Sequence, residues 1–231
     1  LQAGSDQLGI DGLVARQPLD SGTDLKWSIA GPNLRKLADG FGIAGLPAGP
    51  FELRGRLRRE PRASRLDDVR GTIAGADVRV SGRIGDQPLR GTNIALSVEG
   101  PRLEAFAGLL PDYRLPSGKF RVAGALALTP ERVKLTGMRL AAAGAQGTVD
   151  ADIELPLSAV RGDFNVTAKG QDITHFLPRL GAVRPTMMPF DLRVRGAAQG
   201  GAWRLDQAEF NTDAFQLSGS GRLDWAPDFS A

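Results

Sequence analysis

The stretch Asp24–Leu34 reads DLKWSIAGPNL and contains the pattern that decides the fold. Its apolar residues Leu25, Trp27 and Ile29 alternate with Lys26 and Ser28, which is the period of a β-strand with one buried face. The pattern returns in two later stretches: Asn93–Leu103 (NIALSVEGPRL) and Asp163–Ile173 (DFNVTAKGQDI). Their glycines, Gly31, Gly100 and Gly170, are about 70 residues apart, which indicates an internal repeat.

Two further sets of residues keep this spacing. Phe51, Phe120 and Phe190 each open a strand-like run and are again about 70 residues apart. The other set, which has the same interval, is Val14, Ile84, Ile153 and Leu223. Because three sets share one register, we expect residues 1–23 to end a truncated preceding repeat. Three repeats then follow at 24–92, 93–160 and 161–231, forming one elongated domain.

A short helix is predicted inside each repeat, between its first and second strands. In the first repeat Pro32 is placed at the first helical position and Gly40 at the C-terminal cap. The second begins at Pro101 and is stopped by Pro111, and the third has Asp172 as its N-cap. Each repeat is therefore expected to contain a strand, a helix and three more strands.

The predicted fold class is mainly β, an elongated, curled antiparallel sheet built from repeats of about 70 residues, each with one short helix. Alternation makes one face apolar and the other rich in polar residues. Small residues at inward positions, among them Gly55, Gly124, Ala151 and Gly219, favour a partly open β-groove. A sheet that curls into a closed sandwich or barrel is the alternative.

The composition excludes several classes of function. Cysteine is absent, so there is no disulfide framework or thiolate metal site. His175 is the only histidine, and Asp67 and Asp68 are expected on opposite faces of a strand. The sequence contains no run of 18 apolar residues that could cross a bilayer as a helix. We therefore expect no enzyme activity, no metal and no cofactor.

Arginines line the polar side of the strand that begins at Phe51. Arg54, Arg56 and Arg58 form the densest part of this cluster. The net charge is only +3 and no aromatic residues interleave with the arginines, so nucleic acid is not an expected partner. The alternatives are a solvated outer face, or contact with anionic lipid head groups or a partner protein.

Three motifs carry a resemblance to a known family. They are the G-P-x-L-x-x-L segment after the first strand, RVSGRI at Arg79–Ile84 and QLSGSGRL at Gln216–Leu223. With them the chain resembles the AsmA-like family and its TamB-like relatives over nearly its whole length. The third repeat departs from the pattern, with Gly170 and Gln171 in place of Gly-Pro. The resemblance implies a periplasmic segment of a Gram-negative protein anchored in the inner membrane.

The function that the resemblance implies is passage of phospholipids along an apolar groove between the inner and outer membranes. The partners that the resemblance implies are phospholipids and envelope proteins. The inner and outer membranes are also partners, through parts of the protein outside this segment. The alternative is a structural or scaffolding repeat that supports outer-membrane protein assembly and envelope integrity. The residues expected to line the groove are Leu25, Trp27, Ile29, Phe51, Leu53, Leu57, Leu96, Val98, Phe120, Val122, Leu126, Val166, Phe190, Leu192 and Leu217.

Overall fold

The structure is a computed structural model that describes residues 2–3, 6–14, 22–40, 45–86, 91–109, 115–155, 161–173, 187–199 and 202–224. The chain is mainly β, as predicted, and its paired strands are antiparallel. It divides into two compact units, Leu1–Ala123 (unit 1) and Gly124–Ala231 (unit 2). The boundary falls inside strand β8 (Phe120–Leu128).

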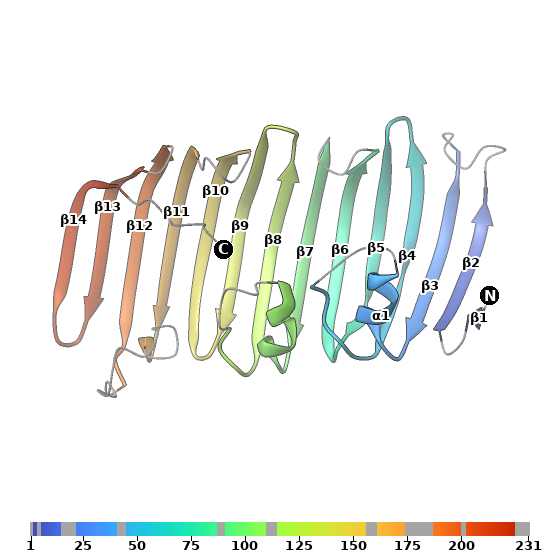
Figure 1. The fold of residues 1–231 in the computed structure, drawn as a ribbon, viewed down its shortest axis with the longest axis horizontal. Coiled ribbons are helices and arrows are strands. Elements are labelled where there is room, and N and C mark those ends of the chain that lie inside the picture. Colours follow the sequence, from blue (N-terminus) through green and yellow to red (C-terminus); the bar gives the residue numbers. More distant parts are fainter. Residues whose placement is uncertain are drawn as a thin grey trace. The chain divides into compact units, whose positions relative to one another are not determined.

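Unit 1 is a sheet in which each strand pairs with the next along the chain (Figure 1). Helix α1 (Leu34–Asp39) separates β3 from β4, and the 3-10 helix η1 (Leu103–Leu109) follows β7. The strands before β8 are β1 (Gln2–Ala3), β2 (Asp6–Leu13), β3 (Asp24–Gly31), β4 (Phe51–Glu60), β5 (Ala63–Ile73), β6 (Ala76–Gly85) and β7 (Thr92–Gly100).

Unit 2 has the same meander of neighbouring antiparallel strands after β8. These strands are β9 (Arg132–Ala142), β10 (Ala145–Glu154), β11 (Arg161–Gly170), β12 (Phe190–Gln199), β13 (Ala202–Thr212) and β14 (Gln216–Asp224). A meander needs only local pairing, because every connection joins strands that are adjacent in the sheet.

Helix α1 forms because Asn33 caps its N-terminus. The Asn33 side-chain oxygen accepts a hydrogen bond from the Lys36 backbone N–H at 3.3 Å. The expectation that Pro32 occupies the first helical position is therefore wrong, since Pro32 precedes the cap. Gly40 is the C-cap, as predicted, and Leu34 and Ala38 are buried at 7% and 4% exposure. In Figure 1, α1 lies in front of β4 and β5.

The other two predicted helices have different outcomes. The second segment is a 3-10 helix that ends at Leu109, ahead of the proline expected to stop it. Residues 174–186, which contain most of the third predicted helix, lie outside the described residues. Asp172, the predicted N-cap there, accepts a hydrogen bond from the Met188 backbone N–H at 3.5 Å.

Register shifts interrupt three strands at similar places. Strand β5 has an extra residue opposite β4 and β6 near Asp68, where φ is +49°. Strand β9 has a shift at Gly137, where φ is +57°, and β13 has one between Leu205 and Ala208. Asp68 and Gly137 are about 70 residues apart, the interval of the sequence repeat. Such bulges bend a strand and increase its twist.

Candidate apolar binding surface

The cross-strand register of unit 1 brings apolar side chains from separate strands into rows. Trp27 lies opposite Ile10 on one side and Gly55 on the other, and Val80 lies opposite Val69 and Leu96. Two flanking rows run parallel to this central row. Along each strand, the residues of the three rows alternate with residues that face the other side of the sheet. Their members are Leu8, Ile29, Leu53, Gly71, Val78 and Val98 in one row, and Gly12, Leu25, Leu57, Leu66, Gly82 and Ile94 in the other.

These rows define the apolar face of unit 1, and most of their large side chains are only half-buried. Trp27, Leu53 and Leu96 are neither buried nor fully exposed. On β2, at one side of the face, Ile10 is 57% exposed. A closed core would bury such residues almost completely. The face is therefore covered only in part by the described chain.

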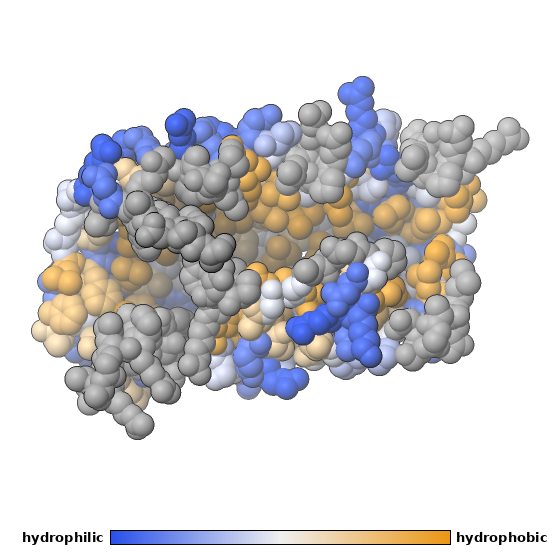
Figure 2. Space-filling model, viewed as in Figure 1, coloured by the Kyte–Doolittle hydropathy of each residue, from blue (hydrophilic) through white to orange (hydrophobic). Residues whose placement is uncertain are grey.

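Most of the buried residues of unit 1 lie near the ends of the strands, although Val69, at 7% exposure, is buried within the central row. Beside α1 the buried residues include Phe51, Ala76 and Val78, with 3%, 1% and 8% exposure. At the opposite end they include Thr23 and Thr92, at 4% and 6%. Figure 2 shows apolar residues gathered over β2–β7 between polar margins. The half-buried band is thus bounded by packed ends.

Unit 2 has rows of the same kind. Val166 lies opposite Val149 and Val194, and Phe210 lies opposite Leu192 and Leu217. All of these side chains are half-buried except Leu217, which is 60% exposed on β14. Each unit therefore presents a face of alternating apolar side chains.

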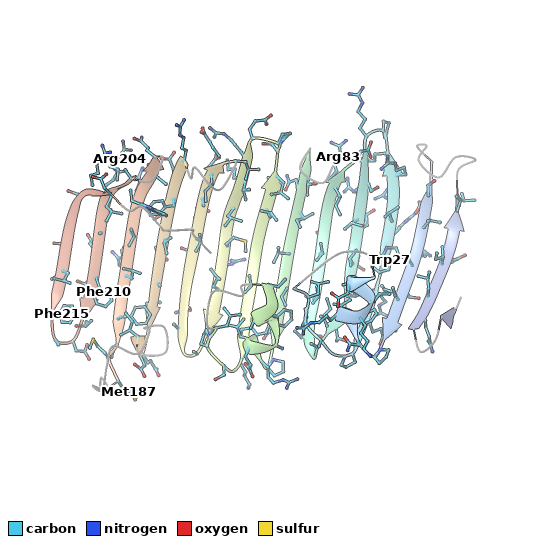
Figure 3. The ribbon with its side chains drawn as sticks, in the orientation of Figure 1. Trp27, Arg83, Met187, Arg204, Phe210 and Phe215 are labelled. Carbon is cyan, nitrogen blue, oxygen red and sulfur yellow. The ribbon has the colours of Figure 1, made fainter. Side chains whose placement is uncertain are left out.

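Aromatic residues occupy two parts of the unit 2 face. Phe164 and Trp203 meet edge to face, with ring centroids 5.3 Å apart. At the β13–β14 turn the rings of Phe210 and Phe215 lie side by side, 5.8 Å apart (Figure 3). Phe215 is 43% exposed, so this pair adds accessible aromatic surface at the end of the hairpin.

The predicted lining residues fall into a buried and a half-buried group, apart from Leu217, which is 60% exposed. Three phenylalanines are buried, with 3% exposure at Phe51, 5% at Phe120 and 8% at Phe190, so they form core and offer little surface to a ligand. Phe120 also packs edge to face on Phe106, with centroids 5.3 Å apart. The half-buried members are Leu25, Trp27, Ile29, Leu53, Leu57, Leu96, Val98, Val122, Leu126, Val166 and Leu192.

The sequence-based set missed several half-buried members of the rows. Leu66, Val80 and Ile94 complete the rows of unit 1, and Val194 and Phe210 do so in unit 2. Their signal was the same alternation that selected the others. Bulges disturb this alternation in β5 and β13, which makes the inward positions harder to assign from spacing alone.

The opposite face of unit 1 is held by ion pairs. Arg56 makes two short hydrogen bonds to Asp24, with N–O distances of 2.6 and 2.5 Å. Asp67 accepts from Arg58 at 2.6 Å and from Arg65 at 2.9 Å. Two of the three arginines predicted to contact head groups, Arg56 and Arg58, are therefore already paired within the sheet.

The expectation that Asp67 and Asp68 point to opposite faces is wrong. Asp68 lies at the β5 bulge and forms an ion pair with Arg70 at 3.4 Å, on the polar face that also holds Asp67. The extra residue of a bulge breaks the two-residue alternation of a strand. Both carboxylates have arginine partners, so their arrangement is that of surface ion pairs and not of an acid–base pair.

These pairs predict how stability depends on pH. The hydrogen bond from Arg65, followed by that from Arg58, holds the pKa of Asp67 below its ordinary value of 3.8. A carboxyl whose pKa is lowered by folding stabilises the fold above the unfolded pKa, and this stabilisation is lost as pH falls through the folded pKa. We expect the free energy of unfolding to fall below about pH 4, and less steeply in Asp67→Asn.

The measurement is urea unfolding of the native chain and of Asp67→Asn between pH 7 and pH 2. The unfolding of unit 1 is the transition that is followed. Asp150→Asn in unit 2 is the control, because Asp150 accepts a hydrogen bond from the Gly137 backbone N–H rather than from an arginine. Equal slopes for the native chain and Asp67→Asn below pH 4 would contradict the prediction.

Other kinds of site find no support in the described part of the chain. No three acidic or histidine side chains gather there as metal ligands, and His175 lies outside it. None of the described helices is both long enough and apolar enough to cross a membrane. No family model, curated protein or solved structure matches the chain.

Proposed function

We propose that the apolar face binds phospholipid acyl chains, and that the chain is a periplasmic segment of an AsmA-like protein carrying lipid between the inner and outer membranes. The observation that carries the proposal is the set of half-buried apolar rows, among them Trp27, Leu53 and Leu96. Such rows offer extended contact along the sheet. The family assignment is supported by the resemblance in sequence motifs.

The repeat architecture is part of the same proposal. Bulges at Asp68 and Gly137 are about 70 residues apart, the spacing expected between repeats. Helix α1 and the 3-10 helix η1 both follow a strand that ends in glycine, at Gly31 and Gly100. These matches support repeats of about 70 residues that stack into an elongated, curled sheet.

Energetics favour an extended surface over a single small pocket. Burying one methylene is worth about 0.8 kcal/mol, so a chain of about sixteen carbons requires roughly 10 kcal/mol of apolar contact to leave a bilayer. A row of half-buried side chains supplies such contact along the whole acyl chain. Transport of this kind requires no covalent chemistry, so we propose neither an enzymatic activity nor a cofactor.

Native mass spectrometry with lipid extraction tests the proposal. The chain is exported to the periplasm of a Gram-negative host and purified without detergent. Phospholipid that co-purifies in stoichiometric amounts is the expected result. A lipid-free, monodisperse protein would instead support the structural or scaffolding alternative, in which the face is covered by protein.

Leu96→Asp is the variant expected to abolish lipid binding. Leu96 lies on the apolar face opposite Val80, so a carboxylate there would be buried against an acyl chain at high cost. The matched control is Ala95→Asp, because Ala95 is its neighbour on β7 but is exposed on the polar face. We expect at least a tenfold loss of bound lipid in Leu96→Asp and little change in Ala95→Asp.

A milder variant separates lipid contact from folding. Val80→Thr keeps the shape of the side chain and replaces one methyl group on the apolar face with a hydroxyl. Circular dichroism and the thermal midpoint establish whether each variant is folded. If folded Val80→Thr and Leu96→Asp both retained normal lipid, the apolar face would not be the binding surface.

A further inference from the structure

Three arginines from three neighbouring strands lie directly opposite one another on the polar face of unit 1. Arg54 on β4 pairs in register with Arg70 on β5, and Arg70 pairs with Arg79 on β6. All three are exposed. Side chains at directly opposed positions are close enough to interact, and like charges there are destabilising. We call these three residues the arginine row.

The arginine row differs from the other arginines of this face in its partners. Arg56, Arg58, Arg65 and Arg83 each have a carboxylate oxygen within 2.5 to 3.2 Å. In the row, only Arg70 has one, at 3.4 Å from Asp68. Across the described residues of the chain, Arg54 and Arg79 form no ion pair and no side-chain hydrogen bond.

The row lies in a shallow depression of about 280 Å³ over β4, β5 and β6. Thr72, Glu52 and Asp77 also line it, and these three form the next cross-strand row. Three guanidinium groups therefore face two carboxylates in the lining. Because the positive charges of the lining exceed the negative charges by only one, a highly charged polymer such as nucleic acid is disfavoured. One compact anion placed over the arginines is favoured.

We infer that the arginine row binds a single phosphate group. Guanidinium groups bind phosphate oxygens through paired, charge-assisted hydrogen bonds, and neighbouring guanidiniums can bind the oxygens of one phosphate group together. Binding relieves the repulsion among three adjacent cations. The Thr72 hydroxyl adds a donor at the border with the acidic row. The inference concerns the polar face and does not depend on acyl-chain binding at the apolar face.

Side-chain NMR of the full chain tests the inference with inorganic phosphate as the probe. The Nε–Hε signals of Arg54, Arg70 and Arg79 are expected to shift and saturate at constant ionic strength, whereas chloride leaves them in place. Arg54→Gln combined with Arg79→Gln is expected to weaken binding about ten- to a hundredfold. The matched control combines Arg65→Gln with Arg83→Gln, which removes two paired arginines of the same face (Arg83 in Figure 3) and leaves binding unchanged.

Vesicles distinguish the source of the phosphate. Sedimentation with phosphatidylglycerol vesicles that depends on Arg54 and Arg79 assigns a lipid head group, whereas a response to phosphate without vesicle binding assigns a soluble phosphate ester. The inference is overturned if neither probe binds. It is also overturned if the control pair loses binding as much as the arginine-row pair does.

Discussion

Replacing Phe51 with alanine is expected to lower the free energy of unfolding of unit 1 by about 3–5 kcal/mol. Phe51 is 3% exposed and lies at the start of β4, opposite Gly31 on β3 and Ile73 on β5. Because Gly31 has no side chain, the Phe51 ring is the only apolar side chain of that cross-strand pair. Alanine would remove both its contacts and the volume that it fills, beside the buried face of α1.

Native-state hydrogen exchange is the appropriate measurement, because a chain with two compact units need not unfold in one step. The amides of β3, β4 and β5 are expected to lose protection. Phe215→Ala is the control, since that ring is 43% exposed and its contact with Phe210 is worth roughly 1 kcal/mol. A loss below about 1.5 kcal/mol in Phe51→Ala would show that the site collapses around the smaller residue.

Gly82→Ala is the second substitution expected to have a large effect, about 2–5 kcal/mol. Gly82 adopts φ of +136°, and an added Cβ would lie 2.2 Å from the backbone oxygen of Asn93 on β7. It would also lie 2.8 Å from the Cα of Ile94. Because these atoms belong to the neighbouring backbone, β6 and β7 would have to separate to accept the methyl group.

The chain provides a control with the same local sequence. Ser-Gly-Arg occurs at 81–83 and again at 220–222, but an added Cβ at Gly221 on β14 meets no atom within 4 Å. Gly221→Ala is therefore expected to change stability by less than about 1 kcal/mol. Hydrogen exchange at β6 and β7 measures the effect of Gly82→Ala. Equal effects of the two substitutions would contradict the assigned clash.

Much of the strand architecture could be predicted from alternation. The strands that contain Trp27, Phe51, Leu96 and Phe190 were all expected, because a two-residue period is a property of the local sequence. The helices were less predictable. Whether Pro32 starts a helix or precedes its cap depends on the competing side chain of Asn33, which forms the actual cap.

The candidate site was predicted in part. Alternation identified Leu53 and Leu96 as inward-facing residues, but it could not distinguish them from Phe51, which also faces inward and is buried. Burial depends on what covers a residue, and α1 covers only one end of the face. Leu66 lies next to the β5 bulge, which disturbs the alternation there, whereas Val80 was missed although β6 alternates regularly.

The sequence by itself determined the strands, their apolar side and the glycines that recur about every 70 residues, because each follows from short-range pattern and spacing. Only the tertiary structure decided which side chains meet. Arg56 is paired with Asp24, 32 positions away, whereas Arg54 lies beside Arg70 without a carboxylate partner of its own. Which residues become partners depends on cross-strand register and on bulges. Both are set by how neighbouring strands pair, and the order of residues within a single strand does not determine them.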